Sequence, residues 1–213
     1  MKSFESLLLD SKSPYLWLKD IEFNLQDSVS AKYGLVHRAL EKKTLIRLTK
    51  GVYLIGQPYR QSTPDLFEIS CLMYPFSYVS IQSSLSYWGW IPEGVFTTTS
   101  VTLNRSQTIE NSLGKFSYFK TPKENFFFGV EYVRSPSNSS YLMARPWKAF
   151  ADLINWSTKS YKTIEDVEED LRIEKETMLE HSLQDLRWLS ENYSKGRVRV
   201  VLKRLLKELV QCL

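Results

Sequence analysis

The 213 residues are 43% hydrophobic and 24% charged, which excludes a disordered chain, and no apolar run approaches the roughly 20 residues needed to cross a membrane. The run Leu7–Leu9 is too short for a signal peptide, and Cys71 and Cys212 form no CxxC pair. We therefore expect free thiols in a reducing cytoplasm, without structural zinc or a disulfide framework.

The net charge of +4 is unevenly distributed along the chain. Residues 12–60 contain nine Lys or Arg against four Asp or Glu, and residues 193–213 contain six against one. Residues 161–192 are acidic, with four Lys or Arg against ten Asp or Glu. Basic segments attract polyanions in a salt-sensitive way, so nucleic acid is a candidate partner.

Helical spacing of apolar residues predicts three helices at the start of the chain. The first is short and begins at Phe4, and the second covers residues 14–26. Ser30 is expected to cap the third helix, whose apolar stripe lies within residues 35–40. Gly34 is unfavourable inside that helix, because glycine has a low helix propensity.

A hairpin follows these helices. Residues 44–48 and 52–55 predict two strands, and Thr49-Lys50-Gly51 predicts the turn between them. Helix, turn, helix and hairpin is the order of a winged helix, which we predict for residues 1–57, with the third helix entering the major groove of double-stranded DNA. The alternative is a small helical subdomain with an ordinary basic face. The residues expected to contact DNA are Ser30, Lys32, Tyr33, His37, Arg38, Lys42, Arg47, Lys50 and Tyr53.

The rest of the chain predicts a mixed α/β domain at residues 64–213, after a proline-containing linker at 58–64. Helices are expected at residues 65–74, 80–88 and 146–156, and strands at 96–103, 116–120 and 126–133. An acidic helical segment at 163–192, broken once, precedes a last helix at 198–213. We expect the leucine stripe of that helix to pack on the acidic segment and its basic face to lie in water. The overall fold class is α/β of the α+β kind, with a C-terminal helical segment.

Catalytic motifs are missing from the sequence: it has no Gly-rich phosphate loop, GxSxG, HExxH or CxxC. Glu131 lies on a predicted strand, but Val133 stands where a metal-dependent nuclease would need its lysine. His37 and His181 are far apart in the sequence. We therefore expect a protein that is not an enzyme and binds no cofactor or metal. The aromatic residues are expected to fill a core or an interface, with at least one of Trp88 and Trp90 buried.

Three stretches resemble one known family. Residues 40–53 contain a predicted strand with an arginine, followed by Lys-Gly-Val-Tyr. Residues 78–92 begin with Tyr-Val-Ser, continue as a predicted helix and end with Gly-Trp-Ile-Pro. In residues 144–154 a proline and then Lys-Ala precede Asp-Leu. In this order they resemble the AbiEi family, the antitoxins and transcriptional regulators of bacterial abortive-infection toxin–antitoxin systems. Trp147 replaces the acidic residue that usually follows the proline in that family.

The resemblance implies a cytoplasmic repressor that binds an operator in its own promoter, as a monomer or homodimer. It also implies that the C-terminal domain counteracts a nucleotidyltransferase-type toxin. Two alternatives remain open: a plain repressor whose second domain dimerises or senses a ligand, and a nuclease delivered to DNA by its winged helix.

Overall fold

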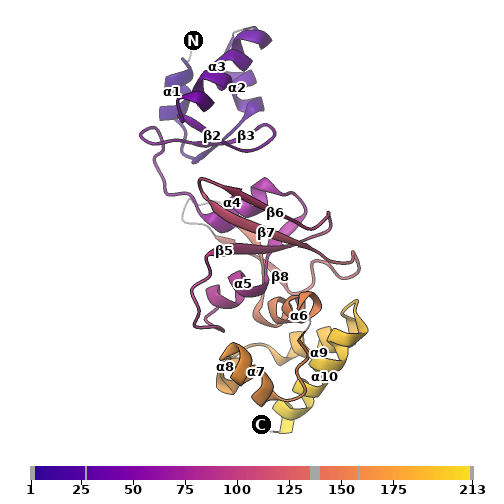
Figure 1. The fold of residues 1–213 in the computed structure, drawn as a ribbon. Coiled ribbons are helices and arrows are strands. Elements are labelled where there is room, and N and C mark those ends of the chain that lie inside the picture. Colours follow the sequence, from indigo (N-terminus) through magenta and orange to yellow (C-terminus); the bar gives the residue numbers. More distant parts are fainter. Residues whose placement is uncertain (1–2, 27, 135–139, 158, 212–213) are drawn as a thin grey trace. The chain divides into compact units, whose positions relative to one another are not determined.

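The computed structural model describes residues 3–26, 28–134, 140–157 and 159–211 (Figure 1). The chain is mixed α/β, as predicted, and divides into two compact units. Of the described residues, those up to Pro75 together with Arg134 and Ser140 form unit 1, and the others form unit 2. Within the described residues, no helix is both long and apolar enough to cross a membrane.

Unit 1 combines helices with a small antiparallel sheet. Its elements are α1 (Phe4–Leu9), β1 (Tyr15–Trp17), α2 (Leu18–Asn24), α3 (Val29–Glu41), β2 (Leu45–Thr49), β3 (Val52–Ile55) and α4 (Leu66–Met73). The strands are ordered β1-β3-β2, and both pairs are antiparallel. The core beneath them is formed by buried side chains of α1, α2, α3 and the sheet, including Leu8, Ile21 and Val36.

The start of the predicted second helix is wrong. Residues 15–17 form a strand, with Tyr15 opposite Leu54 and Trp17 opposite Val52, and the helix begins only at Leu18. The apolar run that looked helical supplies a third strand, because β3 offers it a partner for its backbone hydrogen bonds. The N-cap of α3 is also two residues earlier than predicted: Ser28, not Ser30, accepts a hydrogen bond from the Ala31 N–H.

Helix α4 belongs to unit 1, so the first unit extends to Pro75 and does not stop at the predicted linker. It contacts β2, and its buried Glu68 accepts a hydrogen bond from the Tyr15 hydroxyl at 3.0 Å. Both interactions join α4 to the sheet of unit 1, which places the division between the units after this helix.

Unit 2 is built on a six-stranded mixed sheet with helices stacked on it. Its strands are β4 (Ser77–Val79), β5 (Thr97–Thr102), β6 (Gln107–Asn111), β7 (Gly114–Lys120), β8 (Val130–Arg134) and β9 (Ser140–Ala144), in the order β6-β7-β5-β4-β9-β8. Its helices are α5 (Ile81–Tyr87), α6 (Pro146–Trp156), α7 (Ile164–Leu171), α8 (Lys175–Glu180), α9 (Leu183–Asn192) and α10 (Gly196–Gln211). Figure 1 shows α5 and α6 beside the sheet and α7 to α10 beyond them.

Two predicted elements of unit 2 differ from the structure. Residues 126–129 form a turn, and β8 begins only at Val130; Phe126 is buried in this turn, with its ring 4.8 Å from that of Tyr78. The acidic segment is broken twice rather than once, first at Arg172, which adopts a left-handed conformation, and again at His181. Strands β4, β6 and β9 were not predicted from residues alone.

Helix α10 packs much as predicted. Val198, Val201, Leu202, Leu205 and Leu209 are buried, and the helix contacts α9, within the acidic segment, and also α6. Leu213, the predicted end of the stripe, lies outside the described residues.

The basic face of α10 is only partly free in water. Lys203, Arg204 and Lys207 are exposed, as predicted. Lys195 and Arg197 are exposed as well, but the guanidinium groups of Arg197 and Arg199 donate to backbone carbonyls, including those of Ser157 and Tyr193. These two arginines therefore help to fix the ends of neighbouring helices.

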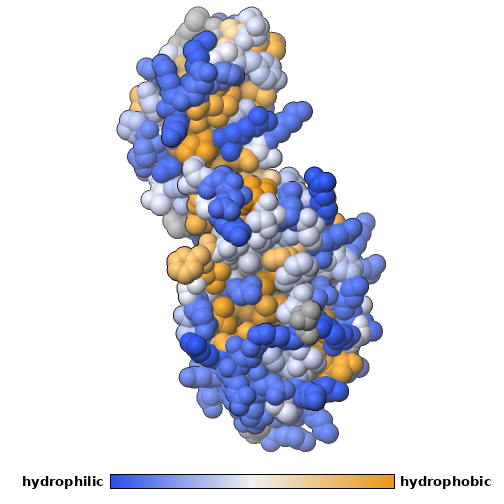
Figure 2. Space-filling model, viewed as in Figure 1, coloured by the Kyte–Doolittle hydropathy of each residue, from blue (hydrophilic) through white to orange (hydrophobic). Residues whose placement is uncertain are grey.

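Aromatic side chains fill the centre of unit 2. Trp90 is 2% exposed, which confirms that one of the two tryptophans beside Gly89 is buried. Its ring lies edge-on to Trp147 with centroids 4.8 Å apart. Trp147, the residue that departs from the AbiEi pattern, is thus a core residue here. Figure 2 shows that hydrophilic side chains cover much of the visible surface, with hydrophobic patches between them.

Candidate nucleic-acid interface and a buried polar network

The outward face of α3 carries polar side chains. Ser30, Tyr33, His37 and Arg38 are all exposed, whereas Val36 and Ala39 are buried in the core of unit 1. The short α2–α3 connection and the Ser28 cap set the start of this helix, so its first turns are presented to solvent. A winged helix presents a helix of this kind to a DNA groove.

Arg38 lies over Gly34. A Cβ atom built on Gly34 would be 3.4 Å from Nη1 of Arg38, so the guanidinium extends back along the helix across this glycine. Within the described part of the chain, Arg38 forms no ion pair. Gly34, although unfavourable inside a helix, therefore leaves room for the guanidinium of Arg38 on the outward face.

The end of α3 is less basic than its sequence suggested. Nδ1 of His37 is 3.5 Å from Oε1 of Glu41, and both side chains are exposed. A carboxylate there repels phosphate.

Two predicted contact residues do not have the exposure expected of them. Lys32 is half-buried, and its Nζ donates to the carbonyl oxygen of Glu22 at 2.8 Å, so it ties α3 to α2. Tyr53 is 6% exposed and packs in the core of unit 1 from β3, opposite Arg47. Helical periodicity did not reveal the Lys32 contact because its partner belongs to another helix.

The β2–β3 hairpin presents two further cations. Arg47 on β2 and Lys50 at the turn are exposed. Gly51 has φ of 78°, a left-handed conformation that glycine adopts without strain, and its carbonyl accepts a hydrogen bond from the Leu18 N–H. The turn is thereby held against the start of α2, which fixes the position of Lys50. Lys19, Lys42 and Lys43 are also exposed; Lys19 and Lys43 were not among the predicted contact residues.

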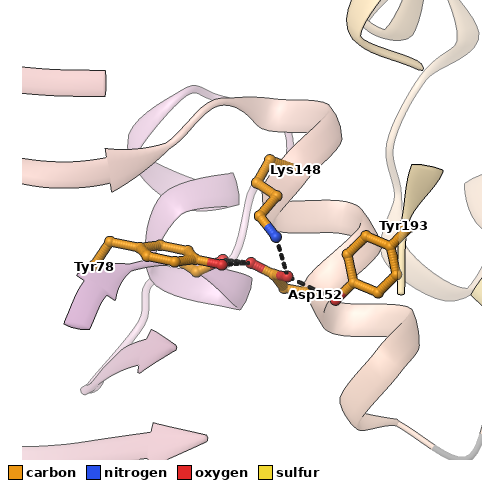
Figure 3. A network of polar contacts seen from close by, with 5 residues as sticks. Tyr78, Lys148, Asp152 and Tyr193 are labelled. Carbon is orange, nitrogen blue, oxygen red and sulfur yellow. Dashed lines mark hydrogen bonds and ion pairs between the residues drawn. The ribbon is translucent and has the colours of Figure 1, made fainter. Parts of the chain in front are cut away.

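Unit 2 contains a buried polar network around Asp152 (Figure 3). Oδ2 of Asp152 accepts hydrogen bonds from Tyr78 and Ser80, both at 2.8 Å. Oδ1 accepts from Tyr193 at 2.8 Å and from Nζ of Lys148 at 3.0 Å. The Lys148 and Asp152 side chains are 4% and 1% exposed. The carboxylate is therefore fully hydrogen-bonded in the core, as a buried charge requires.

The Lys148 side chain is enclosed on several sides. Nζ lies 4.9 Å from the ring centroid of Tyr193 and 5.5 Å from that of Tyr78. Gly129 packs against its aliphatic part, since a Cβ on this glycine would be 2.8 Å from Cβ of Lys148. The network joins β4, the start of α5, α6 and the end of α9, and a cavity of about 10 Å³ beside it is lined by Lys148 and Tyr193. Its arrangement is that of a structural cross-link.

The tyrosines of the network remain protonated donors. Burial, and then the negative charge of Asp152, raises the pKa of both Tyr78 and Tyr193 well above the usual value. In unit 1, burial and Glu68 raise the pKa of Tyr15 in the same way. Each neutral hydroxyl can therefore donate to its carboxylate throughout the neutral range.

These shifts predict destabilisation in alkali. An unfolded tyrosine ionises near pH 10, whereas Tyr78 and Tyr193 keep their protons in the folded state. Because the folded pKa is raised, the stabilisation is complete below about pH 10 and is lost as the pH rises above it. Urea unfolding between about pH 9 and pH 11 should show a falling free energy of unfolding. A Tyr78→Phe, Tyr193→Phe variant should show a shallower fall; an equal slope in parent and variant would contradict the assignment.

The resemblance drew attention to Lys148 and Asp152 but not to their contact with Tyr78, Ser80 and Tyr193. An i,i+4 Lys-Asp pair within a mostly apolar helix was the available signal. Among the described residues, no group of three or more His, Cys, Asp or Glu side chains is placed to hold a metal ion.

Comparison with models of known protein families and with curated proteins finds no match to this chain.

Proposed function

We propose that unit 1 is a winged helix that binds double-stranded DNA, and that the protein is a transcriptional repressor of the AbiEi antitoxin type. The observation that carries the DNA-binding proposal is the presence of exposed cations on two elements of one small unit. Arg38 extends over Gly34 on α3, and Arg47 and Lys50 lie on the β2–β3 hairpin. Helix and hairpin are the two elements with which a winged helix contacts the groove and the backbone.

The order of elements supports the same proposal. Strand β1 lies between α1 and α2, α3 follows after a short turn, and β1 joins the β2–β3 hairpin in a three-stranded antiparallel sheet. This arrangement holds α3 on one side of a rigid sheet. A rigid mounting favours groove recognition, since ordering the contact surface then costs little.

The antitoxin part of the proposal rests on the resemblance and on one structural relationship. The stretches 78–92 and 144–154, which resemble the family separately, meet at the Asp152 network through Tyr78 and Ser80 on one side and Lys148 on the other. They are thus parts of one packed core. By this proposal unit 2 is a non-enzymatic domain that counteracts a nucleotidyltransferase-type toxin, and co-expression with such a toxin from the same operon should restore growth.

DNA binding is tested with the full chain and labelled duplex DNA. We expect binding at low salt, with the logarithm of the association constant falling linearly as the logarithm of the salt concentration rises, because bound cations release counterions from DNA. With about four phosphate contacts, affinity should fall roughly a hundredfold between about 50 and 200 mM salt. An Arg38→Gln, Arg47→Gln, Lys50→Gln variant should show a shallower slope. Absence of binding at low salt, or affinity that does not change with salt, would refute the proposal.

A further inference from the structure

A cavity of about 290 Å³ lies in unit 1 between α1 and α3. Phe4 and Leu8 on α1 and Leu35 and Ala39 on α3 give it an apolar wall. Its volume is close to the lower end of the ~300–1,000 Å³ range of small-molecule sites. The cavity therefore has the size and lining for a compact ligand with an apolar body.

Two positively charged side chains line this cavity. Arg38 lies in the last turn of α3, and Lys42, four residues later, is the C-cap of that helix. Both residues line the cavity and are exposed. Neither forms an ion pair with any other described residue. Glu5 is the one carboxylate among the lining residues, so the charges there favour an anionic ligand.

We propose that this cavity binds a small monocarboxylate with an apolar body. The carboxylate is held by Arg38 and Lys42, and the apolar part lies against Phe4 and Leu35. A guanidinium fork and an ammonium match a carboxylate through charge-assisted hydrogen bonds. A purely polar anion would leave the apolar wall in water, and an uncharged apolar molecule would gain no charge-assisted hydrogen bond from the two cations.

The regulatory consequence rests on the proposed function. Arg38 and Lys42 are also expected to contact DNA, and one cation cannot hold a ligand carboxylate and a phosphate or base edge in full at the same time. Ligand binding and DNA binding are therefore competitive, and by reciprocity each lowers the affinity for the other. A carboxylate of this class would release the repressor from its operator.

The binding test uses octanoate with the full chain and no DNA. Isothermal titration calorimetry, supported by NMR chemical-shift changes, should show one saturable site for octanoate. Octanamide has the same chain without the charge, and acetate has the charge without the chain. The affinity of each should be lower than that of octanoate by a factor of about ten or more. Equal affinity for octanoate and octanamide, or the lack of a saturable octanoate site, would overturn the proposal.

Matched variants locate the site. Arg38→Gln and Lys42→Gln each remove one lining cation, and each should weaken octanoate binding about tenfold. Lys43→Gln removes the same charge from the next exposed position, which does not line the cavity, and should leave octanoate affinity unchanged. Circular dichroism checks that all three variants are folded. If Lys43→Gln weakens binding as much as the other two, octanoate responds to general charge, and the proposed site is wrong.

Measuring DNA binding with and without octanoate separates this inference from the proposed function. Octanoate should raise the apparent Kd for duplex DNA in the parent, and octanamide should not. If the chain binds octanoate as described but binds no duplex at low salt, the DNA-binding proposal fails and the carboxylate site stands. If the chain binds duplex but not octanoate, the carboxylate site fails alone.

Discussion

Replacing Asp152 by alanine is expected to lower the free energy of unfolding of unit 2 by about 3–5 kcal/mol, the usual cost of removing one partner from a buried ion pair. The substitution leaves the buried ammonium of Lys148 without its counterion and deprives the hydroxyls of Tyr78, Ser80 and Tyr193 of their acceptor. Urea unfolding followed by tryptophan fluorescence measures the change, since Trp90 and Trp147 are buried in this unit.

Two further variants show whether the loss comes from the network. Lys148→Met removes the cation but leaves the carboxylate with three hydroxyl donors, so its cost should be smaller than that of Asp152→Ala. Glu169→Ala removes an exposed carboxylate on α7 and should change stability by less than about 0.5 kcal/mol. If Asp152→Ala is no more destabilising than Glu169→Ala, the network does not support the fold as described.

Elements with strong local signals were predicted well from the sequence. The helix at residues 146–156 was placed correctly because Pro146 suits the first helical turn and the apolar spacing continues to Trp156. The β2–β3 hairpin was placed within one residue at each strand, because Gly51 marks the turn between two β-branched and apolar runs. In each case the deciding interactions lie within a few residues of one another.

Features that depend on distant partners were not predicted. Residues 15–17 form a strand because β3 pairs with them, and no pattern within these residues indicates that partner. The Asp152 network draws on residues from Tyr78 to Tyr193, so no single window of sequence contains it. The same reasoning applies to the candidate DNA surface. Periodicity identified its exposed face, but it could not show that Lys32 bonds to the end of α2.

Arg38→Ala is expected to cost about 1–3 kcal/mol of binding free energy at one base pair of a specific site and to relax the preference there. The guanidinium over Gly34 is the one arginine fork on the outward face of α3 in the described chain, and a bidentate contact with a base edge is its most specific use. Lys50, at the hairpin turn, should contact phosphate. Lys50→Ala is therefore expected to weaken binding similarly for all sequences and to reduce the salt slope by about 1.

Selection of preferred duplexes from a randomised pool, followed by titration of single-base variants, measures both effects. Lys115→Ala, which removes an exposed cation from β7 of unit 2, serves as the matched control and should leave affinity and preference unchanged.

Gly34→Ala provides a second check on the geometry. It raises helix propensity, but the new methyl group would lie 3.4 Å from the guanidinium of Arg38. We expect a folded variant with part of the Arg38→Ala defect. If Arg38→Ala and Lys50→Ala both discriminate between sites as well as the parent does, Arg38 does not read a base, and the recognition surface lies elsewhere on the protein.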